Sequence, residues 1–177
     1  MALTLGVDSY VTLEEADLYH EGMGNVSWPQ TPDPDENDVA GKKEAALRRA
    51  TSFIDNLARG KWRGTKASKT QKLAWPRTDA YDEEGFEIDD TVIPEPLKDA
   101  VCEAALKTFT GTDLMPDNRK ANVASEAVSG AVSRSYFQNK SSLPVYNYIC
   151  KLLEGLVSGS LSSSSGSIRA RSGLKVY

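Results

Sequence analysis

Apolar residues recur at the three- and four-residue spacing of an amphipathic helix in several stretches of this chain. The clearest predicted helix extends from Lys42 to Arg59, and Gly60 ends it. Charged side chains lie opposite its apolar face, which consists of Ala46, Leu47, Ala50, Phe53, Ile54 and Leu57. This stretch therefore predicts a helix that packs one side on a hydrophobic core.

Two more helices follow later in the chain. The first begins at the proline-containing stretch Ile93 to Leu97 and runs to about Thr110, where Gly111 caps it. Because this helix is apolar on most sides, we expect it to be central. The second begins after Ser142 to Pro144 and places one apolar seam along its length: Val145, Ile149, Leu152 and Leu156.

The N-terminal region predicts a short helix from about Leu13 to Glu21, ended by Gly22 and Gly24. Thr12 and Glu15 have the spacing of a capping box, in which each side chain bonds the other's backbone amide. Between Ala121 and Gln138 the pattern changes, because Ser and Gly separate the apolar residues. Two extended segments around residues 129–130 are favoured there.

These elements predict a mainly α protein: a small bundle of three main helices plus a short N-terminal helix, a two-stranded β segment and an extended C-terminal arm. At 177 residues, one domain with appendages is expected. The predicted domain covers residues 1–157, with loops at 25–41 and 60–93 and the β segment near 121–138. Residues 158–177 form the predicted arm, since a Gly/Ser run is flexible in isolation.

Composition excludes some classes of protein. The net charge is -4, whereas a dedicated duplex-DNA binder is usually basic. The N-terminus has no signal-peptide pattern and no window approaches a membrane span, so we expect a soluble protein made in a cytoplasm. Cys102 and Cys150 lie in apolar helical patterns, which indicates reduced, buried thiols.

Charge is sorted into two adjacent segments. The cationic segment, residues 59–77, holds seven cations and no acid: Arg59, Lys61, Arg63, Lys66, Lys69, Lys72 and Arg77. The acidic segment, residues 78–90, holds seven acids and no cation: Asp79, Asp82, Glu83, Glu84, Glu87, Asp89 and Asp90. Such a pair suits either nucleic-acid contact through the cations or head-to-tail docking between copies of the chain.

Two tryptophans in the cationic segment, Trp62 and Trp75, have two interpretations. Their rings could stack on bases while the cations follow phosphates, as in single-strand binders. Alternatively, both indoles anchor the loop to the core, which we favour because tryptophan buries a large apolar area. Pro76 disfavours helical geometry at Trp75 and indicates a chain turn.

Catalytic and metal chemistry find little support. His20, the only histidine, is expected on the surface of a short helix, and no nucleophile elbow or P-loop is present. Asp33 to Glu44 matches part of a calcium loop, but Asp38 stands where glycine is required. Carboxylates in the acidic segment have no defined spacing beside a base. We therefore expect no catalytic residue, no cofactor and no bound metal.

Several motifs in order resemble the phage head-tail connector, or adaptor, proteins over about residues 8–156. The motifs are YVTLEEAD at 10–17, Gly24-Asn25 with Trp28, ALRRATSFID at 46–55, WRGT at 62–65, QKLAWPR at 71–77, Ile93-Pro94 and LKDAVCEAA at 97–105. Similar sequences also carry the label DnaT-like single-stranded DNA-binding protein.

The resemblance implies a structural virion protein in the neck between capsid and tail. It would form a ring, commonly a dodecamer, that joins the portal protein to the stopper or tail-completion protein and lets double-stranded DNA pass without sequence-specific binding. No membrane partner is implied. A portal-gripping role would fall on the C-terminal arm, through Leu161, Ile168, Arg169, Arg171, Leu174, Lys175 and Tyr177.

Two hypotheses about function follow. In the first, the chain is a ring-forming adaptor in which the cationic segment and Asp82, Glu83 and Glu84 meet neighbouring subunits or DNA. In the second, it is a single-stranded DNA-binding replication accessory protein that uses the cations with Trp62 and Trp75. A metal-dependent enzyme built on the acidic segment is a third, weaker alternative.

Overall fold

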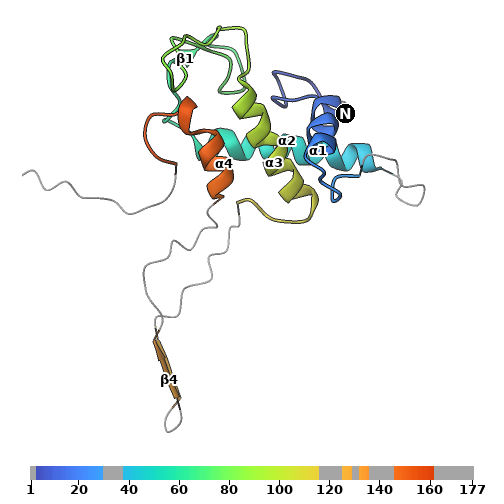
Figure 1. The fold of residues 1–177 in the computed structure, drawn as a ribbon, viewed down its shortest axis with the longest axis vertical. Helices are drawn as coiled ribbons and strands as arrows, with labels where there is room; N and C mark the ends of the chain where they lie inside the picture. The colour runs from blue at the N-terminus through green and yellow to red at the C-terminus, as the bar shows by residue number, and fades with distance from the viewer. Residues whose placement is uncertain (1–2, 30–37, 116–124, 129–131, 136–145, 162–177) are drawn as a thin grey trace, which may run out of the picture.

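The computed structural model describes residues 3–29, 38–115, 125–128, 132–135 and 146–161. Within them, α1 (Leu13–Gly22), α2 (Val39–Leu57), α3 (Glu95–Phe109) and α4 (Asn147–Leu152) form a helical body, and a 3-10 turn, η1 (Glu154–Leu156), follows α4 (Figure 1). The predicted mainly α class is confirmed. The predicted C-terminal arm lies outside the described residues from position 162 onward.

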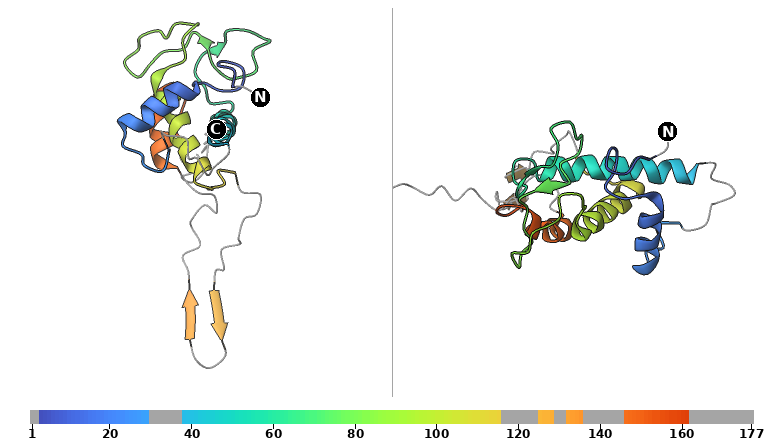
Figure 2. Two further views of the ribbon diagram at one scale, coloured as in Figure 1. Left: turned by 90° about the vertical axis from the view of Figure 1, so that its right-hand side faces the viewer. Right: turned by 90° about the horizontal axis from the view of Figure 1, so that it is seen from above.

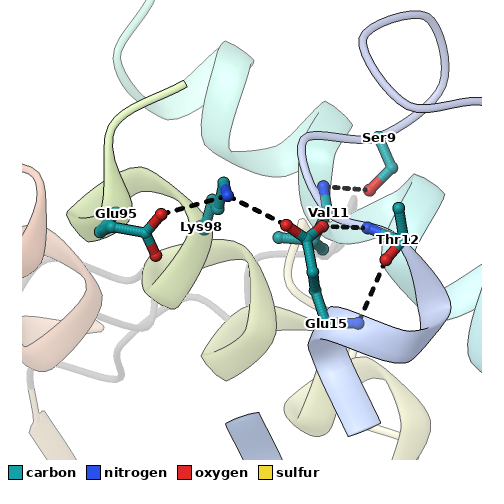
Figure 3. Close-up of polar contacts among 6 residues, drawn as sticks. All are labelled: Ser9, Val11, Thr12, Glu15, Glu95 and Lys98. Atoms are coloured by element: carbon teal, nitrogen blue, oxygen red, sulfur yellow. Dashed lines mark hydrogen bonds and ion pairs between the residues drawn. The ribbon is translucent and has the colours of Figure 1, made fainter. Parts of the chain in front are cut away.

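Helix α1 begins with the predicted capping box. The Thr12 hydroxyl accepts a hydrogen bond from the Glu15 amide at 3.1 Å, and the Glu15 carboxylate accepts one from the Thr12 amide at 2.8 Å. The same carboxylate pairs with Lys98 of α3 at 3.0 Å, and Lys98 also pairs with Glu95 (Figure 3). The cap therefore also ties α1 to the start of α3.

Helix α3 occupies the centre of the body, as its apolar composition predicts. It packs mainly on α2 and also contacts α1 and α4 (Figure 2). Six of its side chains are buried: Leu97, Ala100, Val101, Cys102, Ala104 and Ala105. Helix α2 begins three residues before the predicted position, because the Asp38 side chain accepts a hydrogen bond from the Gly41 amide at 3.0 Å and caps it.

One hydrophobic core joins all four helices and the loops. Its largest fully buried side chains include Trp28, Trp75, Tyr10, Leu47, Ile54, Leu97, Ile149 and Leu153. Both cysteines are free; Cys102 is buried and Cys150 half-buried. Burial raises the pKa of the Cys102 thiol to about 12, which keeps it protonated and inert.

One expectation about burial near the N-terminus is wrong, because His20 is fully buried and not on the surface. Trp28, inside the predicted loop at 25–41, is also buried, with 1% of its surface exposed. The two rings pack with centroids 4.5 Å apart. The Asn25 amide donates to His20 Nδ1 at 3.0 Å, and Trp28 Nε1 donates to Asp17 at 2.7 Å. These bonds satisfy polar atoms that would otherwise oppose burial.

The last helix is shorter than predicted. Helix α4 ends at Leu152, and the chain tightens into η1, so the seam does not continue with α-helical spacing. Leu152 was predicted to be part of the buried seam, but it is half-buried, and Leu153 is fully buried instead. Ile149 and Leu156 are buried as predicted, whereas Val145 lies outside the described residues.

Two small antiparallel sheets complete the structure. Strands β3 (Ser125–Val128) and β4 (Val132–Ser135) pair as predicted, with Ser125 opposite Ser135. Strands β1 (Thr65–Lys66) and β2 (Arg77–Thr78) lie inside the predicted loop at 60–93 and were not predicted, because two-residue strands have no periodicity to detect. Within the acidic segment, an isolated antiparallel bridge places Tyr81 opposite Glu87 and forms a short hairpin. Among the described residues, no helix has the length and apolar character needed to cross a membrane.

Candidate nucleic-acid interface

The cationic segment is fixed to the core by a buried hydrogen-bond network around Tyr10. The Tyr10 hydroxyl donates to Asp55 of α2 at 2.5 Å and accepts from the Ala74 and Trp75 amides at 2.9 and 3.2 Å. The second Asp55 oxygen accepts from the Ala74 amide at 3.0 Å. Burial raises the pKa of Asp55, although the bonds from Tyr10 and Ala74 oppose that rise.

Both tryptophans of the segment lie against this anchor. Trp75 is completely buried, and Trp62 is half-buried and packs on the core. Their rings meet edge to face, with centroids 6.1 Å apart. Neither indole nitrogen has a hydrogen-bond partner among the described residues. Trp75 is thus removed from any base-stacking role, while one side of Trp62 still lines a surface cleft.

Arg77 holds the segment in its folded shape. Its guanidinium donates to the carbonyls of Arg63 and Gly64, both at 2.6 Å, and to that of Ala74 at 3.1 Å. Gly64 has φ 67°, and a Cβ there would lie 2.2 Å from the Thr78 carbonyl oxygen. Only glycine therefore lets the β1–β2 pair close at this point. Burial lowers the pKa of Arg77, yet a guanidinium stays charged at neutral pH.

Two further cations bond to backbone carbonyls. Arg63 donates to Val157 at 3.2 Å and, across the gap to the acidic segment, to Asp82 at 3.3 Å. Lys61 donates to the Ser160 carbonyl at 2.8 Å. Lys61, Arg63 and Arg77 are half-buried, so these three cations stabilise the loop and the end of the described chain.

The other four cations, Arg59, Lys66, Lys69 and Lys72, are exposed. Lys66 bonds the Gln71 carbonyl at 3.2 Å, and Lys72 pairs with Asp8 at 3.0 Å, which lowers the pKa of Asp8. The side chains of Arg59 and Lys69 form no hydrogen bond or ion pair among the described residues, although the charge of Arg59 acts to lower the pKa of Asp55.

A cleft of about 390 Å³ lies between α2 and the cationic segment, and we call it the basic cleft. It is lined by Asp55, Arg59, Gly60, Trp62, Lys66, Lys72, Ala74 and Arg77. Four cations, one acid and one indole thus share a single concavity. Such a lining can hold phosphate groups beside a base, or carboxylates from another protein. Lys61, Arg63 and Lys69 lie outside this lining.

Asp82, Glu83 and Glu84, which are predicted to meet neighbouring subunits or DNA, do not line the basic cleft of their own chain, and their contact with another copy stays a prediction. The Asp82 carboxylate accepts from the Glu84 and Phe86 amides at 2.9 and 2.8 Å and so shapes its own turn. Glu83 packs over Gly155, where an added Cβ would lie 2.7 Å from its Cγ. Glu84 is exposed. Within the described residues, no carboxylate of the acidic segment forms an ion pair with a cation of the cationic segment.

The structure gives less support to the other candidate sites. No cluster of three or more His, Cys, Asp or Glu side chains in the described part of the chain could hold a metal ion. Residues 33–37 of the partial calcium loop lie outside the described residues, and its Asp38 caps α2. Of the predicted portal-gripping residues, Leu161 packs partly on the core, and the remaining six lie outside the described residues: Ile168, Arg169, Arg171, Leu174, Lys175 and Tyr177.

The comparisons with known proteins give one match. A family model described as "Putative DnaT-like ssDNA binding protein" matches residues 2–172, which is nearly the whole chain. No curated protein matches the chain, and no solved structure does.

Proposed function

Because the chain belongs to the family of DnaT-like ssDNA-binding proteins, we propose that it contacts DNA without catalysis, as the ring-forming head-to-tail adaptor of a phage virion. The ring would join the portal protein to the stopper or tail and form part of the DNA channel. The family supports DNA contact. The adaptor role rests on the order of motifs between Tyr10 and Ala105 and on the shape of the molecule.

The observation that carries this proposal is the β3–β4 hairpin. Figures 1 and 2 show both strands standing away from the helical body, and among the described residues each pairs only with the other. A two-stranded hairpin alone is marginally stable in water and needs packing against another surface. A neighbouring subunit related by ring symmetry would supply that surface for every copy at once.

Imaging of the full-length protein tests the ring directly. We expect negative-stain micrographs and sedimentation to show closed rings, formed by the protein alone or after addition of portal protein. A variant with residues 125–135 replaced by a short Gly-Ser linker should keep its helical circular dichroism and lose the rings. A chain that stays monomeric at every concentration, with and without portal, would overturn the proposal.

A second candidate function, binding of single-stranded DNA in replication, is favoured by the basic cleft. Exposed cations beside the half-buried Trp62 resemble the combination of phosphate contacts and base stacking used by single-strand binders. Trp62 is the one indole at this cleft, however, so the described residues offer no row of aromatic rings on which successive bases could stack.

Fluorescence anisotropy with a labelled oligothymidine separates the two functions. If the cleft binds DNA, changing Arg59 and Lys66 to Ala should weaken binding about tenfold or more and reduce its salt dependence. Changing Arg49 and Lys151 to Ala removes the same charge elsewhere and should have little effect. Arg63 and Arg77 are unsuitable for this test because they hold the loop together. Equal binding by both double variants would exclude the cleft as the site.

A further inference from the structure

The acidic segment forms a compact hairpin that presents two aromatic side chains to solvent. Its turn is closed by hydrogen bonds from the Asp82 amide to the Phe86 carbonyl at 2.9 Å and from the Ile88 amide to the Ala80 carbonyl at 2.8 Å. Tyr81 is 45% exposed and Phe86 is 67% exposed. An aromatic side chain held this far out on a tightly bonded turn is available to a partner.

The same hairpin carries a dense negative charge, of which Glu83 interacts electrostatically with Lys151. Six of its carboxylates are exposed: Asp79, Glu83, Glu84, Glu87, Asp89 and Asp90. None of them forms an ion pair with another described residue. A complementary partner would therefore be basic and would also carry apolar groups for Tyr81 and Phe86.

The chain itself contains one segment of that composition. Residues 168–177 hold three cations, Arg169, Arg171 and Lys175, and no acid, together with Ile168, Leu174, Val176 and Tyr177. We propose that residues 168–177 dock on the acidic segment of their own subunit, with cations against the carboxylates and apolar side chains against Tyr81 and Phe86. This docking does not depend on the proposed ring.

The path of the chain favours docking within one subunit. One guanidinium, that of Arg63, donates both to the Val157 carbonyl and to the Asp82 carbonyl. The chain therefore passes directly beside the acidic segment shortly before the arm begins. From Val157 to Ile168 the backbone can extend by about 35 Å, so the arm has ample reach. A linker of this length also gives a high effective concentration of the arm at the hairpin.

Site-specific photo-crosslinking in the full-length protein tests the proposal. The exposed Phe86 is replaced by p-benzoylphenylalanine, and the crosslinked peptides are identified by mass spectrometry after irradiation. We expect crosslinks to residues 168–177 within one chain, at a yield that does not change on dilution. Because the attraction is largely between exposed charges, the yield should fall about threefold or more between 0.05 and 1 M salt.

Charge reversal supplies the matched controls. In the protein that carries the photo-crosslinker, the double change Glu84→Lys and Glu87→Lys should reduce the crosslinking yield at least about threefold. Adding Arg169→Glu and Arg171→Glu to that variant should restore much of the lost yield. Glu14→Lys with Glu21→Lys makes the same charge change at two exposed residues of α1, outside the acidic segment, and should leave the yield unchanged. Crosslinks to any other segment, crosslinks that join two chains, or a yield indifferent to the reversal would each overturn the proposal.

Discussion

The cationic and acidic segments carry seven charges each, but the fold uses these charges differently. In the cationic segment, Lys61, Arg63 and Arg77 are half-buried and donate to backbone carbonyls, so part of its charge stabilises the loop. In the acidic segment, the carboxylates of Asp82 and Asp89 accept hydrogen bonds within their own turns, and six carboxylates, including that of Asp89, stay exposed. Equal charge in the sequence therefore does not mean equal charge available at the surface.

The aromatic residues of the two segments show the same difference. Trp75 is completely buried against the Tyr10 and Asp55 network, whereas Phe86 is 67% exposed. One segment thus buries an aromatic ring in the core, whereas the other packs on the core through Ala80 and Ile88 and keeps its aromatic rings exposed. The predictions below test this difference, beginning with the largest expected effect.

Removing the buried indole should have the largest effect. We expect Trp75→Ala to lower the free energy of unfolding by about 4 kcal/mol, because a large side chain is replaced by a cavity. Phe86→Ala should change it by less than about 0.5 kcal/mol, since the ring is exposed. Urea unfolding followed by circular dichroism measures both. Similar losses in the two variants would show that the segments do not differ in their attachment.

Removing the Arg77 guanidinium should have a smaller but clear effect. Arg77→Ala leaves three carbonyls without their charged donor, and we expect a loss of about 2 kcal/mol. Arg77→Lys keeps the charge but not the fork of donors, so it should recover only part of that stability. Glu84→Gln in the acidic segment is the matched control, with an expected change near zero. Full recovery by lysine would mean that charge, and not carbonyl bonding, holds the loop.

Much of the helical body could be predicted from the sequence, because long amphipathic patterns and caps are local signals. The apolar face of α2 and the Thr12–Glu15 capping box are examples. The burial of His20 and Trp28 could not be predicted, because it depends on Asn25, Asp17 and Phe109 meeting in space. No pattern of residue spacing along the chain predicts these side-chain contacts.

The candidate site was predictable only in part, for the same reason. The seven cations are visible as a run, but their division into carbonyl-bonding and exposed groups depends on partners far along the chain. Val157 and Ser160, for example, lie almost a hundred positions from Arg63 and Lys61. Asp55 contributes to the basic cleft from α2, where its position gave no sign of that role.

The smallest predicted effect concerns acidification, and it distinguishes a buried titratable group from the exposed carboxylates. Burial lowers the pKa of His20 to about 4, below its ordinary value of about 6.5. Between these values the unfolded chain binds the proton more readily than the folded chain, so stability should fall as the pH drops from 6.5 toward 5, by roughly 1 to 2 kcal/mol. Protonation of Asp55 has the opposite effect on stability. Because the pKa of Asp55 is raised in the folded chain, the folded chain binds this proton at a higher pH than the unfolded chain does.

Comparison of variants isolates the two contributions. The difference in unfolding free energy between wild type and His20→Gln should shrink as the pH falls from 7 to 5, because the wild type alone loses the contribution of a buried neutral imidazole. A variant with Glu83, Glu84 and Glu87 all changed to Gln should follow the wild-type pH profile closely between pH 7 and 5, since exposed carboxylates contribute little to folding stability even where they meet cations. If that triple variant instead flattened the profile, the acidic segment would be part of the folded network, and its contrast with the cationic segment would be lost.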